Sequence, residues 1–478
     1  MKTRCLVFLL ACTAASAQKV TGPVPVTADS HPFLAAAHNL QPMDLAKVGY
    51  LEEEFLVSGT ANVYDWASDG SLKVKTSNAP YTTRILVRRP ADAARFNGTV
   101  VVELPNTARR FDWSMLWGYM HNYVTDSGAA WVGVTMPGAV DGLKKFNPTR
   151  YASLSFANPT PTEACAAGGR GGRGGSATSN DEDGLRWDAI SQVGALLKSG
   201  NLPGLKADHV VLTTQGADVV TYINAIQPSS KVYDGFVVKS PGPPTRLSRC
   251  DTAPGNGDAR QLIHNAGVPV VAVLTQGEVV ASLPYLREDS DVPVDRFRLY
   301  EIAGAAHIDS APYIAMPSVA DQTAGGGAQG TPQWPFNLRC DPEIPLQNLP
   351  LQAYVLDAAF AGLDLWVKKG TAPPRAARIE LKDGTVALDQ FGNGIGGVRS
   401  PYVEVPTASY FTTTPGPGTC RELGSAAGFS WARLDALYGS YKNYAAKAGQ
   451  SVDRMRKERF LTEGDAQRMR ENLLESSH

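Results

Sequence analysis

The stretch HVVLTTQGADVVTYINAI, residues 209–226, indicates a β-strand, a tight turn and an α-helix in direct succession. Its first five residues form a β-branched apolar run, which is typical of a strand buried on both faces. After the turn, apolar residues follow the i, i+3, i+4, i+7 spacing of an amphipathic helix from Ala217 to Ile226. A strand that leads directly into a helix is the repeating unit of α/β proteins.

Similar strands recur on both sides of this stretch. Near-continuous apolar runs occur as RILVRR from Arg84, TVVVEL from Thr99, AWVGVT from Ala130, GFVVK from Gly235, VPVVAVL from Val268 and FRLYEIAG from Phe297. Two further strands are expected over Tyr50–Tyr64 and near Leu72–Lys75, and a helix over Asp183–Lys198. The alternation of strands and helices predicts an α/β fold with a mostly parallel, doubly wound sheet.

The chain divides into four predicted parts. These are a signal peptide at 1–17, an irregular segment at 18–45, an α/β domain at 46–425 and C-terminal helices at 426–478. Insertions into the domain are expected near 160–182, where AAGGRGGRGGSATSN is Gly/Arg-rich, and near 310–350, which contains AGGGAQGTPQWP. In the C-terminal part, one amphipathic helix is expected over Phe429–Gln450, and Thr462-x-x-Asp465 resembles a capping box that opens the last helix.

The first residues predict export to the periplasm or beyond. Lys2 and Arg4 precede the apolar run CLVFLLA, and Ala15-Ser16-Ala17 forms an A-x-A cleavage site. Cleavage is expected after Ala17, with a lipoprotein signal at Cys12 as the minority alternative. The apolar run is far shorter than the ~20 residues that cross a bilayer, so no transmembrane segment is expected.

Charge and cysteine usage restrict the partners. Lys+Arg 45 against Asp+Glu 46 leaves a net charge of −1, which argues against nucleic-acid binding. Beyond the signal peptide, Cys165, Cys250, Cys340 and Cys420 predict two disulfides with three open pairings. No Cys-x-x-Cys pair occurs and the seven histidines are scattered, so no metal site is expected. The expected partner is a small-molecule substrate, without a cofactor, and the oligomeric state stays open.

Residues with catalytic chemistry follow the strands. Thr213 and Thr214 lie at the turn after the strand at 209, Glu278 follows the run VPVVAVL, and His307 follows FRLYEIAG. Reactive groups of open α/β sheets gather at the carboxyl ends of strands, and the order hydroxyl, acid, histidine is that of the α/β hydrolases. The acid fixes the imidazole tautomer, and the second imidazole nitrogen then takes the proton of the nucleophile. Asp309 and Asp289 are alternative acids.

Several motifs resemble those of the bacterial family of exported alpha/beta hydrolase domain-containing proteins. They include TVVVELPN, AWVGVTMPGAV, FNPTRYASLSFANP, GLRWDAISQVGALL, DRFRLYEIAGAAH and FGNGIGGVRSPYVEVPTASY. The similarity extends from about Val48 to about Gln467. It implies an alpha/beta-hydrolase fold with a serine nucleophile, an acid and a histidine that act on esters or related acyl bonds. Glu278 falls on the family's acid position and His307 on its histidine position.

The nucleophile departs from the family pattern. The family's Gly-x-Ser-Gln-Ser/Thr-Gly corresponds here to Leu212-Thr213-Thr214-Gln215-Gly216. Counting back from TYINAI without a gap puts Thr213 on the serine position, whereas a one-residue deletion puts Thr214 there, which we prefer. The turn holds its nucleophile at positive φ, which a β-branched residue tolerates poorly. Ser240 follows the strand GFVVK, but the PGPP behind it cannot open a helix.

The sequence therefore predicts an exported hydrolase with Thr214 or Thr213 as nucleophile, Glu278 and His307. The alternatives are a hydrolase-fold ligand-binding protein without turnover, and a non-hydrolytic acid–base enzyme that uses His307. Backbone N–H groups near Thr107 and of Gln215, next to Asn106, are expected to bind the oxyanion. Arginines at 109 and 110 would favour an anionic substrate if they face the site.

Overall fold

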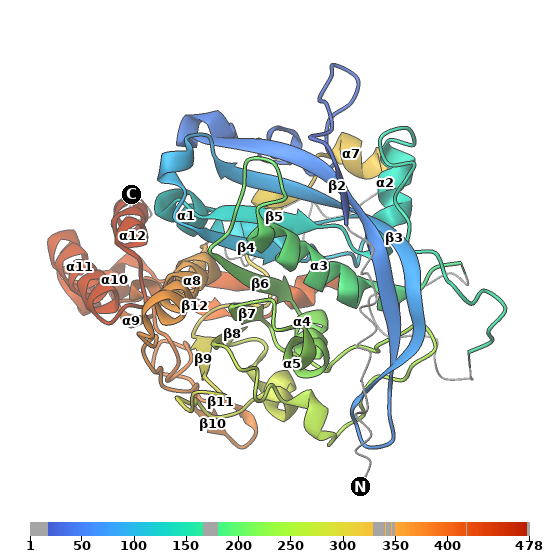
Figure 1. The fold of residues 1–478 in the computed structure, drawn as a ribbon. Coiled ribbons are helices and arrows are strands. Elements are labelled where there is room, and N and C mark those ends of the chain that lie inside the picture. Colours follow the sequence, from blue (N-terminus) through green and yellow to red (C-terminus); the bar gives the residue numbers. More distant parts are fainter. Residues whose placement is uncertain are drawn as a thin grey trace, which may run out of the picture.

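The computed structural model describes residues 18–165, 180–327, 340, 346, 349–416 and 418–475. The predicted signal peptide at 1–17 and most of the Gly/Arg-rich insertion lie outside the described residues, as does most of AGGGAQGTPQWP. A nine-stranded sheet in the order β1-β2-β3-β5-β4-β6-β7-β8-β9 forms the centre of the molecule (Figure 1).

Most strands of this sheet begin and end close to the predicted apolar runs, but the first strand, Lys19–Thr21, lies in the segment 18–45 that the sequence predicted to be irregular. The strands are β1 (Lys19–Thr21), β2 (Tyr50–Trp66), β3 (Leu72–Pro90), β4 (Thr99–Glu103), β5 (Ala130–Val134), β6 (His209–Gln215), β7 (Gly235–Lys239), β8 (Val270–Thr275) and β9 (Phe297–Ile302). Strands β5, β4, β6, β7, β8 and β9 are parallel, and β1, β2 and β3 add an antiparallel edge. The predicted mostly parallel α/β sheet is therefore confirmed.

One strand is longer than its sequence pattern suggested. The runs near Leu72 and Arg84 join in the single 19-residue strand β3, which pairs with β2 as a long hairpin (Figure 1). Polar residues interrupt the apolar pattern between the two runs. The two runs form one continuous strand because both pair with β2.

Helices cover both faces of the sheet, and the C-terminal helices pack on other helices at one side of it (Figure 1). In chain order, the helices of the described residues are α1 (Met115–Ser127), α2 (Val140–Phe146), α3 (Arg186–Ser199), α4 (Ala217–Thr221), α5 (Gln227–Ser230), α6 (Val279–Ser282), α7 (Val319–Ala324), α8 (Leu351–Lys369), α9 (Pro401–Glu404), α10 (Trp431–Tyr438), α11 (Tyr441–Lys457) and α12 (Glu463–Glu475). Short strands β10 (Leu381–Lys382), β11 (Thr385–Val386), β12 (Ala408–Phe411) and β13 (Ser425–Gly428) form two small sheets.

Two hydrophobic cores lie on opposite faces of the sheet. Along β4, Val101 belongs to the core that contains α1 and α8, and Val100 and Val102 belong to the core with α3 and α4. Successive residues of a strand point to opposite faces, so an uninterrupted apolar strand supplies both cores.

Two predicted helices are interrupted. The helix expected over 217–226 is regular only in α4, and the chain continues as a π-helical turn over Tyr222–Ile226. The single helix expected over 429–450 is wrong, because the chain breaks into α10 and α11 at Gly439, which has φ 69°. The predicted cap of the last helix is present: Asp465 N donates to Thr462 Oγ1 at 3.1 Å.

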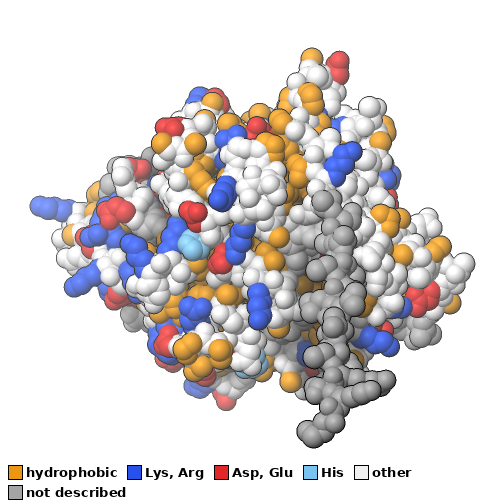
Figure 2. All heavy atoms as spheres, viewed as in Figure 1, with side chains coloured by type: hydrophobic (Ala, Val, Ile, Leu, Met, Phe, Trp, Pro, Cys, Tyr) orange, Lys and Arg blue, Asp and Glu red, His pale blue; other side chains and the backbone are white. Residues whose placement is uncertain are grey.

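Two disulfides pair Cys165 with Cys250 and Cys340 with Cys420, which selects one of the three open pairings. Among the described helices, none is long and apolar enough to cross a bilayer. Basic and acidic side chains are interspersed over the face drawn in Figure 2, in keeping with the net charge of −1.

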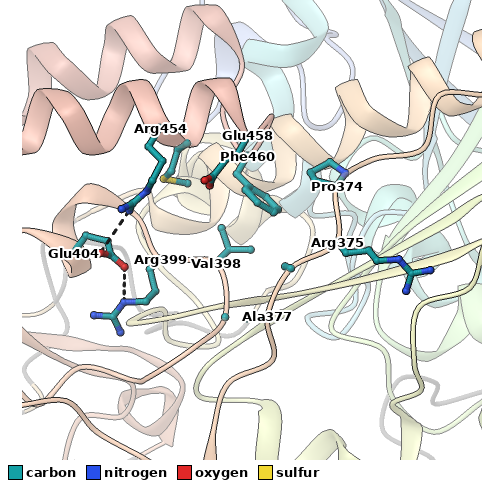
Figure 3. Close-up of a pocket in the computed structure, with 12 residues that line it drawn as sticks. Pro374, Arg375, Ala377, Val398, Arg399, Glu404, Arg454, Glu458 and Phe460 are labelled. Atoms are coloured by element: carbon teal, nitrogen blue, oxygen red, sulfur yellow. Dashed lines mark hydrogen bonds and ion pairs between the residues drawn. The ribbon is translucent and has the colours of Figure 1, made fainter.

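A cavity of about 580 Å³ lies between α11 and the segment that precedes α9 (Figure 3). Two of its basic groups are paired within the cavity wall, since Glu404 pairs with Arg399 at 2.8 Å and with Arg454 at 3.5 Å. Val398, Met455 and Phe460 supply its apolar lining.

Candidate active site

Glu278 lies in a tight turn directly after β8. Its backbone N–H donates to Thr275 O at 2.9 Å, and its Oε2 accepts from Thr275 N at 2.8 Å. These two hydrogen bonds fold the glutamate back over the strand end. The side chain is buried at 8% exposure, so its carboxylate has a fixed direction.

His307 reaches the same point from β9. Gly304 turns the chain at φ 75°, and its N–H donates to Gln276 Oε1 at 2.8 Å. The imidazole Nδ1 of His307 is hydrogen-bonded to Glu278 Oε1, and the side chain keeps 34% of its surface exposed. The structure thus brings the predicted acid and histidine into contact, with the imidazole open to solvent.

The surroundings of Glu278 keep it ionised. Ser240 Oγ donates to Glu278 Oε1 at 2.5 Å, and Lys239 Nζ lies 3.8 Å from the same oxygen. Burial raises the pKa of Glu278, but the charge of Lys239 and the hydrogen bond from His307 outweigh it and lower the pKa to about 2. A carboxylate that is charged at neutral pH accepts the proton on Nδ1, which leaves Nε2 of His307 as the basic nitrogen.

Gln215 faces this basic nitrogen. Ala108 N donates to Asn106 Oδ1 at 2.9 Å, so the Asn106 amide nitrogen points to Gln215 Oε1, at 3.5 Å. The Gln215 amide nitrogen is thereby directed at His307 Nε2, at 3.3 Å. Because an amide nitrogen only donates, His307 Nε2 is the acceptor in this contact, and the ring proton lies on Nδ1, against Glu278.

The two threonines are directed elsewhere. Thr213 Oγ1 donates to Val237 O in β7, and Thr214 Oγ1 donates to Leu104 O after β4, each at 2.8 Å. Both residues are almost fully buried in β6. In the described part of the chain, the structure does not bring either hydroxyl to His307, and a threonine nucleophile would first have to leave its carbonyl partner.

Gly216 occupies the turn between β6 and α4. Its backbone, with φ 94° and ψ −149°, has the strained positive-φ conformation expected for the nucleophile of a strand–turn–helix elbow. A Cβ atom on Gly216 would meet no described atom within 4 Å. The elbow geometry is therefore present, but a glycine without a side chain stands at its tip.

The other predicted site residues are divided between the site and its rim. Asn106 and Gln215 lie at the site, and Thr107 opens the turn that Arg110 N closes onto Thr107 O at 2.8 Å. Arg110 is exposed and turns to Asp141 at 3.6 Å, whereas the Arg109 guanidinium lies over the ring of Trp113 at 5.3 Å.

The alternative acids serve the scaffold. Asp309 is fully enclosed and accepts from Ala311 N at 2.9 Å and from Gln352 N at 3.2 Å. Burial raises its pKa to about 6 against these two hydrogen bonds. Asp289 accepts from Leu299 N at 2.9 Å, beside β9. Glu278 is the carboxylate that contacts His307.

Lys239 and Ser240 are site residues that the sequence did not assign. Lys239 is buried, and its Nζ donates to Ser240 Oγ at 2.9 Å and to His307 O at 3.2 Å. Ser240 has φ 54°, an unusual backbone for a non-glycine residue. Both residues lie at the end of the parallel strand β7. The same strand-end rule that pointed to Glu278 and His307 could therefore have identified them from the sequence.

The family comparison covers most of the chain. The sequence profile of a family described as "Alpha/beta hydrolase domain" matches residues 20–471. No curated protein matches the chain. Similar solved structures include a bacterial heroin esterase (10% identity, 59% of this chain and 83% of that chain, TM-score 0.29) and the esterase Est22 (12% identity, 58% and 79%, TM-score 0.29). A cold-adapted esterase from an Arctic intertidal metagenomic library is a third (11% identity, 52% and 83%, TM-score 0.25). On the profile match, this chain belongs to the alpha/beta hydrolase domain family.

Proposed function

We propose that the protein hydrolyses carboxylic esters or related acyl bonds, with His307 as general base and Glu278 as the residue that orients it. The observation that carries this proposal is the Nδ1 contact of His307 with an ionised, buried Glu278. With its proton on Nδ1, the imidazole keeps an Nε2 lone pair, which accepts from the Gln215 amide until that amide turns aside in the partly exposed site. This is the protonation state that a general base needs.

The nucleophile in this proposal is water. In the described residues, no hydroxyl side chain contacts His307 Nε2, and Gly216 leaves open space at the tip of the turn. When the Gln215 amide turns away from His307 Nε2, a water molecule in its place can give one proton to that nitrogen while the water oxygen attacks the acyl carbon. The tetrahedral intermediate collapses as the C–O bond to the alcohol breaks, and His307 returns the proton to the departing alkoxide. The products are an acid and an alcohol.

Donors for the oxyanion come from the two loops that meet at Gln215. In this proposal the backbone N–H groups near Thr107 and of Gln215 bind the oxyanion of the tetrahedral intermediate. The Arg109 guanidinium lies over the ring of Trp113, which follows the loop of Asn106 and Thr107, and burial lowers its pKa. It is the residue we assign to an anionic group on the substrate, since a guanidinium binds carboxylates with paired hydrogen bonds.

A second function is favoured by the glycine at position 216. A hydrolase fold without a side-chain nucleophile can bind an ester-like ligand without turning it over. In that case Gln215 would donate its amide to a ligand oxygen instead of to His307. Export of the protein, predicted from residues 1–17, applies to both functions.

The test is an assay of the protein on a panel of activated esters and thioesters, beside His307→Ala, Glu278→Gln and Thr214→Val. General-base catalysis contributes roughly 10²–10⁴-fold, so His307→Ala should lose at least about 100-fold in kcat/KM. Glu278→Gln should lose less, and Thr214→Val should stay within about twofold, because its hydroxyl serves a carbonyl.

Intact-mass analysis of quenched reactions separates the nucleophiles. Water attack leaves the protein mass unchanged, whereas a threonine nucleophile would give an acylated protein that disappears in Thr213→Val or Thr214→Val. Equal, background-level turnover by the parent and His307→Ala would reject the hydrolase proposal and favour the ligand-binding function.

A further inference from the structure

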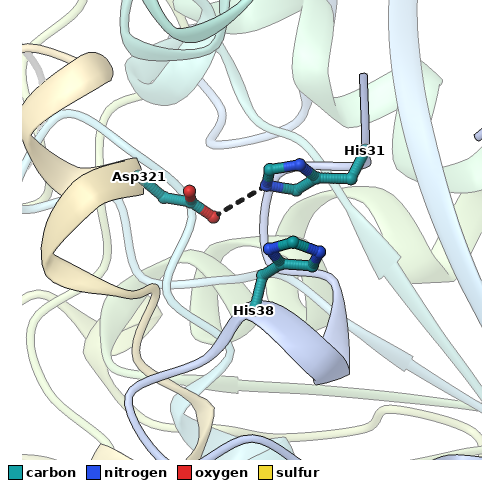
Figure 4. Close-up of side chains that lie close together, drawn as sticks. All are labelled: His31, His38 and Asp321. Carbon is teal, nitrogen blue, oxygen red and sulfur yellow. Dashed lines mark hydrogen bonds and ion pairs between the residues drawn. The ribbon is translucent and has the colours of Figure 1, made fainter. Parts of the chain in front are cut away.

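Three metal-ligating side chains that take no part in the Glu278–His307 contact come together, one exposed, one half-buried and one buried (Figure 4). His31 Nε2 lies 3.2 Å from Asp321 Oδ2, and the ring of His38 stacks on that of His31 with centroids 3.6 Å apart. One ligand atom from each of the three residues lies within 4.8 Å of the others. The residues come from the N-terminal segment and from α7, with 290 positions between His31 and Asp321.

Backbone contacts hold together the two segments that carry His38 and Asp321. Ser318 N donates to His38 O at 2.9 Å, so the end of the turn Ala36–His38 lies against the start of α7. Ser318 Oγ in turn accepts from Asp321 N at 3.1 Å and caps that helix. Asp321 is 5% exposed, so its carboxylate direction is fixed by the scaffold.

The third side chain is fixed from the opposite side. Ser30, next to His31, accepts through its Oγ from Asn147 Nδ2 and from Arg150 Nη1, each at 3.1 Å. The edge of the Phe146 ring packs on the His31 ring, with centroids 5.3 Å apart and planes at 73°. All three ligands therefore sit on segments with defined neighbours.

The distances fit a zinc ion after one side chain moves. Ligand atoms of a tetrahedral zinc ion with bonds of 2.0–2.1 Å lie roughly 3.3 Å apart. The pair His31–Asp321 already has this separation. The stacked histidine planes are inclined by only 9°, and a metal cannot lie in two nearly parallel ring planes. His38 is exposed, so its ring can tilt away from the His31 ring to complete the site.

We propose that His31, His38 and Asp321 bind a zinc ion, with water as the fourth ligand. Two imidazoles and one carboxylate are a donor set that zinc takes in proteins. The ion would join the N-terminal segment to α7, two parts of the chain that the disulfides leave unconnected. This site is independent of the proposed hydrolase function.

Calorimetric titration of the metal-free protein with Zn²⁺ tests the site. One ion per chain is expected, and His38→Ala and Asp321→Asn should each weaken the affinity at least about tenfold. The matched control is His264→Ala, an exposed histidine 4.0 Å from the single carboxylate of Asp295, which should leave the affinity unchanged. At a hundredfold excess of zinc over its Kd, the Tm should rise by about 3 °C in the parent and not in His38→Ala.

Three outcomes would overturn the assignment. They are no stoichiometric binding, unchanged binding in both His38→Ala and Asp321→Asn, and loss of binding in His307→Ala, which would place the ion at the Glu278–His307 pair. A zinc anomalous signal between the three side chains, in a crystal of the loaded protein, is the expected structural result. Because His38 is exposed, its replacement tests the site without disturbing the core.

Discussion

The Gln215 side-chain amide donates to Nε2 of His307 across 3.3 Å. In a serine hydrolase of this fold, a nucleophile hydroxyl makes this contact. The Gln215 group at this place is an amide nitrogen, which cannot act as the nucleophile on an acyl carbon. Because it only donates, it identifies His307 Nε2 as the acceptor. The basic nitrogen is thus present and oriented. The nucleophile that it deprotonates is not one of the described side chains in contact with it.

The first prediction restores a side-chain nucleophile. Gly216→Ser places a hydroxyl at the tip of the turn, where a Cβ meets open space. We expect faster ester hydrolysis and an acylated protein detectable by intact mass, at a cost of about 1–3 kcal/mol in stability for a non-glycine residue at positive φ. Gly216→Ala is the matched control, with the same strain and no hydroxyl. A folded Gly216→Ser variant without an acyl adduct would show that Gly216 is not at the nucleophile position.

The second prediction concerns Ser240. Its hydroxyl donates to Glu278 Oε1 at 2.5 Å and positions the carboxylate against His307. Ser240→Ala should lower kcat by up to about 10–150-fold with little change in KM, since one charged-acceptor hydrogen bond contributes about 1.5–3 kcal/mol. Ser240→Gly also removes the hydroxyl but relieves the positive φ of 54°. We expect the two variants to be equally active and Ser240→Gly to be the more stable of the two. Wild-type activity in both variants would contradict a positioning role for Ser240.

The third prediction concerns stability against pH. The pKa of Glu278 is lowered to about 2 in the folded protein, from a model-compound value of 4.5. Its ionised form therefore contributes to stability above pH 4.5, by up to about 3 kcal/mol, and this contribution is lost as the pH falls toward 2. The stability difference between the parent and Glu278→Gln, measured by chemical denaturation, should be largest at pH 7 and narrow below pH 4.5. For the exposed Glu458, a Glu458→Gln variant should show no such narrowing.

The fourth prediction separates the two disulfides. Cys340–Cys420 closes 80 residues, and its loss should cost about 4 kcal/mol in the chain-entropy estimate. Cys420 precedes Glu422, whose carbonyl accepts from Ile308 N at 2.9 Å, directly after His307. A Cys340→Ser/Cys420→Ser double variant should therefore lose activity as well as stability.

The other disulfide provides the control for that experiment. Cys165–Cys250 closes 85 residues, so a Cys165→Ser/Cys250→Ser double variant should show a similar fall in Tm. We expect it to keep its kcat at temperatures where it is folded. Loss of activity in both double variants to the same degree would contradict a specific link between Cys420 and the histidine loop.

Local patterns in the sequence were sufficient for the parallel part of the sheet and for half of the site. The apolar runs that became β4 to β9 are buried on both faces, and such burial requires an unbroken run of apolar residues that is visible without any structure. Glu278 and His307 were found because the ends of parallel strands lie along one edge of the sheet. That rule needs only the strand boundaries.

Contacts between distant segments decided the rest. The hydroxyls of Thr213 and Thr214 are engaged by carbonyls of neighbouring strands, and which carbonyl faces each one depends on the pairing of β6 with its neighbours. The conformation of Gly216 and the approach of Gln215 to His307 likewise arise only when β6, β8 and β9 are assembled. The cluster of His31, His38 and Asp321 joins residues 290 positions apart. Sequence periodicity reports which face of an element is buried, whereas the partner of each polar atom is set by the three-dimensional packing of the chain.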